Sequence, residues 1–230
     1  MYTKDARRAG TVLLVNPNTN IATTEMMRSL AERELAGTGL AVEGLTAAAG
    51  PAMILDPVAL AASAPEVLEA VHRRLADDGG TVRAVIVAAI GDPGRKELEA
   101  LLPGIPVIGI GQASVLKASA GGRGFGMATS TPLLAESLGV LAAEHGGGAA
   151  FAGVELTVSP PLELAADPER QFQELSDAVG RCVQAGAEAV IIAGGPLSET
   201  ARRLAEQGTV EIVEPVPSAC ALVRERLGIA

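Results

Sequence analysis

Two stretches of the chain repeat the same order of residue types. Val82–Ser114 aligns without a gap with Ala187–Ala219, so that equivalent residues lie 105 positions apart. Each stretch runs through an apolar strand, a turn of small residues, a helix, a second apolar strand and a further segment of small residues. Two such units can bring equivalent turns face to face across a pseudo-twofold axis. The repeat therefore predicts two similar lobes that hold one small molecule between them.

Apolar segments alternate with helical segments along the whole chain. We predict strands at 11–15, 40–45, 84–89, 106–110, 124–128, 153–158, 189–193 and 210–213. We predict helices at 21–36, 57–75, 94–102, 132–144, 168–186, 199–207 and from 216 onward. Continuous apolar strands separated by helices are typical of a parallel sheet that is covered on both faces.

The expected fold class is therefore α/β, with two pseudo-symmetric lobes, each a parallel sheet flanked by helices, and a ligand cleft between them. The glycine-rich segment 120–124 suggests a boundary, so we expect a first lobe at residues 1–120 and a second at 121–230. The last helix could pack back on the first lobe.

Composition limits the partners that such a chain can have. The net charge is -9 and only 2% of the residues are aromatic, whereas nucleic-acid binding needs basic patches and stacking rings. No segment has the length and apolarity of a signal peptide or a membrane span, so we expect a cytoplasmic protein with no membrane partner. Cys182 and Cys220 are the two cysteines, and we expect them to be reduced thiols.

Cofactor motifs are missing from the sequence. No Gly-x-Gly-x-x-Gly motif follows a predicted strand, and no phosphate-loop lysine is present. No cluster of histidine or cysteine has the spacing of metal ligands. We therefore expect no nucleotide, no metal and no other cofactor.

The turns that follow the strands are the candidate ligand site, because open parallel sheets bind ligands beyond the carboxyl ends of their strands. Each of these turns leads into a helix, whose free N–H groups can bind carboxylate or imide oxygens. The alternative is that their Asn, Ser and Thr side chains are helix N-caps. The candidate substrate-binding residues are Asn16, Asn18, Thr19, Gln112, Thr129, Ser130, Gly195 and Ser198. Asp92 is either a turn residue or an acid–base group.

Several motifs in this order resemble the aspartate/glutamate/hydantoin racemase superfamily, and its hydantoin and allantoin racemases in particular. The motifs are VNPNTN at 15–20, GP at 50–51, IGDPG at 90–94, PVIGIGQAS at 106–114, FGMATSTP at 125–132 and VEPV at 213–216. The resemblance implies a two-lobed fold, a substrate in the inter-lobe cleft, no cofactor and a homo-oligomer. It also implies two catalytic cysteines, one per lobe, of which one removes the α-proton and the other returns a proton to the opposite face.

This chain departs from the family pattern at both of those cysteines. The resemblance puts the first immediately before the IGDPG motif, at Ala89, and the second at Gly194. The repeat relates the same two positions, since they lie 105 residues apart. Neither a methyl group nor a hydrogen atom can transfer a proton, so we expect racemisation by two thiols to be absent. Ala89, Gly194 and Asp92 are the candidate catalytic positions.

The prediction is a cofactor-independent enzyme that acts on a small carboxylate, hydantoin or ureide by an altered reaction. Single-cysteine decarboxylases in the superfamily make a lyase, decarboxylase, hydratase or cyclase reaction plausible by resemblance. Asp92, Glu199 or Cys220 could supply a single acid or base. Two alternatives stay open: a non-catalytic protein that binds a small anion, and a racemase with bases other than cysteine.

Overall fold

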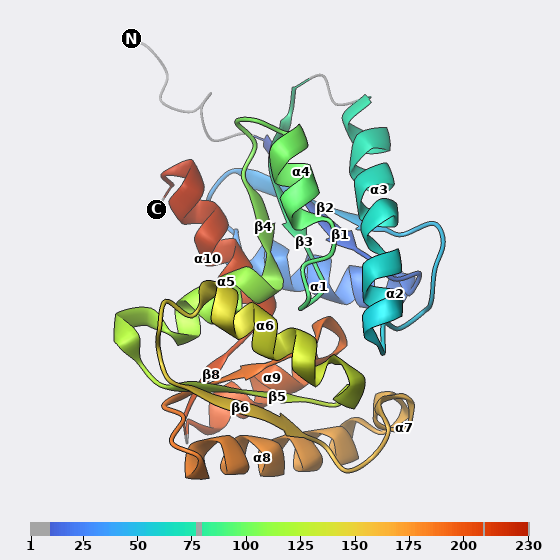
Figure 1. Ribbon diagram of the computed structural model, residues 1–230. Helices are drawn as coiled ribbons and strands as arrows, with labels where there is room; N and C mark the ends of the chain where they lie inside the picture. The colour runs from blue at the N-terminus through green and yellow to red at the C-terminus, as the bar shows by residue number, and fades with distance from the viewer. Residues whose placement is uncertain (1–9, 77–79, 209, 230) are drawn as a thin grey trace.

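The structure is a computed structural model that describes residues 10–76, 80–208 and 210–229. It consists of two four-stranded parallel sheets with the same topology, each flanked by helices (Figure 1). The first sheet has the order β2-β1-β3-β4 and the second the order β6-β5-β7-β8. The strands are β1 (Gly10–Asn16), β2 (Leu40–Thr46), β3 (Val82–Val87), β4 (Val107–Gly109), β5 (Phe125–Thr129), β6 (Phe151–Leu156), β7 (Ala189–Ile192) and β8 (Glu211–Val213). The expected α/β fold with two similar lobes is confirmed.

The first sheet has helices on both faces. On one face α1 (Ile21–Glu34) and α10 (Pro215–Leu227) cover β1 and β3 with an apolar cluster that includes Met27 and Val223. On the other face α3 (Ala64–Ala76) and α4 (Arg95–Leu101) bury Val67 and Leu98. The central strands β1 and β3 are mostly apolar because helices cover both of their faces.

The second sheet repeats this arrangement. Helices α8 (Pro168–Gln184) and α9 (Ser198–Gln207) cover one face, where Leu175 and Leu204 are buried. Helices α5 (Ile110–Ala118) and α6 (Ala135–His145) cover the other face, where Val115 and Leu138 are buried.

The two lobes exchange one helix each. Helix α5 follows the last strand of the first sheet, yet its Val115 and Ala118 belong to the core of the second lobe. Helix α10 follows the last strand of the second sheet, and its Val216 and Cys220 belong to the core of the first lobe. In Figure 1, α10 lies beside β4, and α5 lies between the two sheets. This exchange joins the lobes through two apolar cores.

The structure differs from the sequence prediction in three helices. The expected helix at 57–75 is divided at Ser63 into α2 (Pro57–Ala62) and α3, because Pro65 in the first turn of α3 has no N–H to donate to the preceding turn. Two helices were not predicted: α5, and α7 (Pro161–Ala166). Gly109 and Gly111 conceal the start of α5 from a propensity-based prediction.

None of the helices in the described part of the chain combines the length and hydropathy that a bilayer crossing requires. The charged N-terminal segment 1–9 lies outside the described residues.

Candidate functional site

A cavity of about 330 Å³ lies between the two lobes. The first lobe lines it with the segment after β3, residues 88–91, and the second lobe with the segment after β7, residues 193–197. Ala89 and Gly194 are both among the lining residues. The structure thus brings the two equivalent turns of the repeat to one cavity.

Identical backbone hydrogen bonds hold the two turns. The N–H of Ala88 donates to the carbonyl of Val15 at 2.8 Å, and the N–H of Ala193 donates to the carbonyl of Ala128 at 2.8 Å. Each turn therefore begins as an extension of its parallel ladder. Because the neighbouring strands are buried, the positions of Ala89 and Gly194 are set by the sheets and not by mobile loops.

The turns after β1 and β5 have matching roles as well. In the first lobe, Asn16 is fully buried, and its amide donates to the side chains of Asn18 at 2.9 Å and Thr24 at 3.0 Å. In the second lobe, the Thr129 hydroxyl donates to the Ala193 carbonyl at 2.7 Å. Asn16 therefore supports the turn from behind, while Asn18 and Thr129 reach the cavity.

The residues selected from the sequence divide into two groups. The cavity lining contains Ala89, Gly194, Asn18, Thr129, Ser130 and Gly195. Its described part does not contain Asn16, Thr19, Gln112, Ser198 or Asp92. Two residues of this second group make hydrogen bonds within the protein. The Thr19 N–H donates to Pro51 O at 3.1 Å, and the Ser198 hydroxyl donates to Gly195 O at 2.7 Å.

Asp92 lies behind the first turn and ties it to α5. Its carboxylate accepts hydrogen bonds from the N–H groups of Gly111 at 2.8 Å and Gln112 at 2.6 Å, at the start of that helix. An ideal Cβ at position 109 would lie 2.0 Å from the Asp92 Cγ, so Gly109 cannot carry a side chain here. Asp92 has a left-handed backbone, with a φ of 48°. Burial raises its pKa to about 7, against the lowering effect of the two N–H donors and of Arg95.

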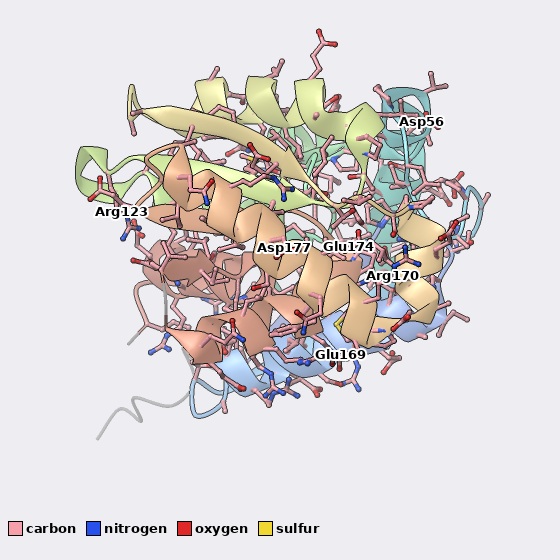
Figure 2. The ribbon with its side chains drawn as sticks, turned by 90° about the horizontal axis from the view of Figure 1, so that it is seen from below. Asp56, Arg123, Glu169, Arg170, Glu174 and Asp177 are labelled. Carbon is pink, nitrogen blue, oxygen red and sulfur yellow. The ribbon has the colours of Figure 1, made fainter. Side chains whose placement is uncertain are left out.

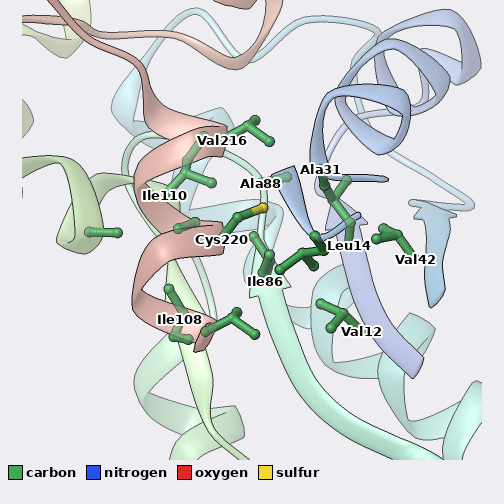
Figure 3. Packing of buried hydrophobic residues seen from close by; sticks show 14 of the residues in the cluster. Val12, Leu14, Ala31, Val42, Ile86, Ala88, Ile108, Ile110, Val216 and Cys220 are labelled. Carbon is green, nitrogen blue, oxygen red and sulfur yellow. The ribbon is translucent and has the colours of Figure 1, made fainter. Parts of the chain in front are cut away.

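The two thiols lie in the cores of different lobes. Cys220 packs among Leu14, Ile86 and Ala88 in the first lobe, as Figure 3 shows, and Cys182 belongs to the core of the second. Each residue is 1% exposed. Desolvation raises the pKa of Cys182 to about 11 and that of Cys220 to about 12. A thiolate is therefore strongly disfavoured at both positions, and neither sulfur lines the described cavity.

The outer wall of the cavity was not predicted from the sequence, apart from Glu199, which was named as a possible acid or base. It comes from α7, from the start of α8 and from α9, which contribute Leu164, Gln171, Glu199, Thr200 and Arg203. Glu199, Thr200 and Arg203 follow the Gly194 turn at helical spacing, so one face of α9 points at the ligand space. The sequence could have predicted the α9 part of this wall from that spacing, because a helix that begins at a ligand-binding turn presents its first two turns to the ligand.

No group of three or more potential metal ligands is found in the part of the chain that the structure describes.

Comparison with known proteins agrees with this geometry. The profile of the Asp/Glu/hydantoin racemase family matches residues 12–223. A hydantoin racemase from Paenarthrobacter aurescens is 26% identical over 210 residues, which cover 91% of this chain and 87% of that protein. The allantoin racemase from Klebsiella pneumoniae superposes with a TM-score of 0.84 at 25% identity, over 96% of this chain and 90% of the other.

An arylmalonate decarboxylase shares the fold at a lower level. Its TM-score is 0.65 at 15% identity, and the superposition covers 95% or more of this chain and 92% or more of that one. From the family profile and the matching fold, we conclude that the chain belongs to the Asp/Glu/hydantoin racemase family.

Proposed function

We propose that this protein is a cofactor-independent enzyme that binds a small carboxylate, hydantoin or ureide in the inter-lobe cavity and does not racemise it with two thiols. One observation carries the proposal. Ala89 and Gly194 line the same cavity from opposite lobes, while both sulfurs are buried in separate cores. The relative from Paenarthrobacter aurescens named above is a hydantoin racemase, which supports a ring imide or ureide as the ligand class.

The cavity retains groups that can stabilise negative charge on a ligand. The amide nitrogen of Asn18 and the hydroxyl of Ser130 line it. Polar groups that are held in place before the reaction stabilise a developing enolate at little reorganisation cost. An enolate left by decarboxylation needs only one proton, whereas racemisation needs a proton removed from one face and another added to the opposite face. The missing thiol pair therefore favours a one-proton reaction.

The proton donor or acceptor in that reaction is Glu199. It is the carboxylate of the described cavity lining, and its side chain is exposed to the solvent, so it can exchange protons with water. Asp92 has a different role in the proposal. Because its carboxylate is bound to the start of α5, Asp92 positions residues 89–91 and does not touch the substrate.

A proton-exchange experiment tests the proposed function. The protein is incubated in deuterated water with racemic and single-enantiomer 5-substituted hydantoins, allantoin and arylmalonates, and followed by NMR and chiral chromatography. We expect turnover or α-carbon exchange without inversion, and its loss in Glu199→Gln. Inversion by the natural sequence would contradict the proposal and favour a racemase with bases other than cysteine.

A second candidate function is non-catalytic binding of the same class of ligand. The observation that favours it is the absence of an ionisable side chain at either central position, Ala89 or Gly194. Thermal stabilisation by a ligand with neither exchange nor turnover would support this second candidate over the enzyme.

A further inference from the structure

One cation lines the described part of the cavity, and it is Arg203 on the second turn of α9. Its guanidinium lies over the ring of Phe172, 4.0 Å from the centroid. It also donates a hydrogen bond of 2.9 Å to the carboxylate of Glu169. Glu169 belongs to the first turn of α8, which Figure 2 shows with Arg170 and Glu174 further along the same helix. The aromatic contact orients the guanidinium at the wall of the cavity.

The ion pair with Glu169 is weakly held. The side chain of Glu169 is 66% exposed and that of Arg203 is 41% exposed. Ion pairs with this degree of exposure contribute little free energy, because water and salt screen them. The pair also uses one of the five N–H donors of the guanidinium. A ligand carboxylate could therefore replace Glu169, or bind beside it, at small cost.

The wall that carries Arg203 is fixed by a buried polar pair. The Thr200 hydroxyl donates to the Gln171 side-chain oxygen at 2.6 Å, and both residues are more than nine-tenths buried. The Gln171 amide in turn donates to the carbonyl of Leu164 in α7 at 3.4 Å. These contacts join α7, α8 and α9 around the cavity. Arg203 is thus presented from a rigid surface, which reduces the entropy lost when a ligand binds.

Charge is arranged along the cavity from its centre outwards. Gly194 is at the central turn, Glu199 lies on the first turn of α9, and Arg203 follows one turn later. An anionic group near Glu199 would be repelled, whereas one that reaches Arg203 would be attracted. The apolar side chains of Leu134 and Leu164 line the same cavity and can cover a hydrocarbon spacer.

We propose that Arg203 is a specificity-determining residue that selects substrates with a carboxylate at the end of a short side chain, remote from the carbon held between Ala89 and Gly194. The inference rests on the proposed function, because it assumes that this cavity binds the substrate. Beyond the proposed function, the inference specifies which part of the substrate α9 recognises.

The test compares 5-(2-carboxyethyl)hydantoin with 5-propylhydantoin, whose side chain has the same three carbons without the carboxylate oxygens, by calorimetric titration at neutral pH and low salt. We expect the natural protein to bind the carboxylate about 10-fold more tightly than the neutral ligand, as one charge-assisted contact allows. Arg203→Gln should remove this preference by weakening binding of the carboxylate ligand about 10-fold, while 5-propylhydantoin should still bind. Glu169→Gln, which removes the competing carboxylate, should raise affinity for the carboxylate ligand alone.

The matched control is Arg202→Gln, which removes an exposed cation from the same helix outside the cavity lining. It should change neither affinity. Equal binding of both ligands to the natural protein, or an unchanged preference in Arg203→Gln, would overturn the role of Arg203 and leave the proposed function standing. If neither ligand binds, the hydantoin assignment itself fails, and the inference fails with it. Retained binding of the neutral ligand shows that each variant is folded.

Discussion

Gly195 of the second lobe packs against Ala88 of the first. A Cβ atom at position 195 would lie 3.3 Å from the Ala88 carbonyl oxygen and 3.0 Å from the sulfur of Met27. The two turns that carry Ala89 and Gly194 are therefore in direct contact next to the cavity. Their separation is set by this close approach, which only a residue without a side chain allows at position 195 without displacing a neighbour.

A methyl group at position 111 should disrupt the support of the first turn. The added Cβ would lie 2.1 Å from the Ile90 carbonyl oxygen, so the backbone of the turn must move. We expect Gly111→Ala to lower the free energy of unfolding by about 3 kcal/mol in urea titrations. Gly139→Ala is the matched control, because Gly139 lies within α6 with no atom near its added Cβ. It should raise stability by about 0.5–1 kcal/mol. Equal effects of the two changes would contradict the contact at Gly111.

The Asp92 carboxyl should make stability decrease as the pH rises. Its pKa is about 7 in the folded protein and 3.8 for the free group, so between these values the folded state binds more protons than the unfolded state. The contribution of Asp92 to the free energy of unfolding is therefore fully present below pH 3.8. It is lost as the pH rises through 7, and the loss is at most about 4 kcal/mol. Asp92→Asn removes the titrating carboxyl group. In denaturant unfolding, this change should lower the free energy of unfolding more at pH 5 than at pH 8. A greater cost at pH 8 would show that the ionised carboxylate is the stabilising form.

Two introduced thiols should create racemase activity. Position 194 has an extended backbone with a φ of 168°, and its added Cβ lies 3.1 Å from the Leu197 side chain, so Leu197 needs to shift by a few tenths of an ångström. We expect Ala89→Cys combined with Gly194→Cys to invert a 5-substituted hydantoin, measured by chiral chromatography with α-deuterium incorporation. The Ala89→Ser, Gly194→Ser double variant has side chains of similar size without the acidic thiol, and it should have no racemase activity.

Gly194→Cys alone should give exchange with little inversion, because this thiol and Glu199 both belong to the second lobe and the opposite face of the substrate then has no proton donor. A folded double-cysteine variant that binds ligand without any exchange would place the reacting carbon elsewhere in the cavity.

The natural thiols should not react in the folded protein. Burial raises the pKa of both Cys182 and Cys220 well above neutral pH and blocks the approach of reagents. We expect no alkylation by iodoacetamide at pH 8 by intact-mass spectrometry, and two adducts in 6 M guanidinium. Ligand binding should be the same before and after the native treatment. Modification of one cysteine in the native state, accompanied by loss of binding, would mean that this thiol reaches the ligand.

Much of the fold could be predicted from local patterns in the chain. Apolar runs such as 84–87 and Ala189–Ile192 identify buried parallel strands, because such strands need apolar side chains on both faces. The repeat also predicted that the turns after those strands share one site, and the structure places Ala89 and Gly194 in one cavity. Residues that follow equivalent strands must meet if the lobes face each other.

Other features depend on contacts between distant segments. Asn16 and Asn18 are the same residue type two positions apart, yet the Asn16 side chain turns inward to Thr24, whereas Asn18 reaches the cavity. Asp92 was a candidate acid–base group, and its position behind the turn depends on Gly109 at the end of β4 and on Gly111 in the first turn of α5. Neither choice can be made from the residue types alone, since an amide or a carboxylate can serve as a ligand contact or as a backbone support.

Residue order was enough to establish the α/β class, the duplicated lobes and the pair of central positions that lack a reactive group. The class and the duplication follow from periodicity and spacing along the chain, and the resemblance to a known family identified the two central positions. The exchange of α5 and α10 between the lobes, the wall formed by α7, α8 and α9, and the burial of both sulfurs depended on three-dimensional packing. The free energy gained by burying apolar surface depends on its area and not on its direction. Many helix arrangements therefore satisfy the same sequence pattern, and the contacts between distant segments select among them.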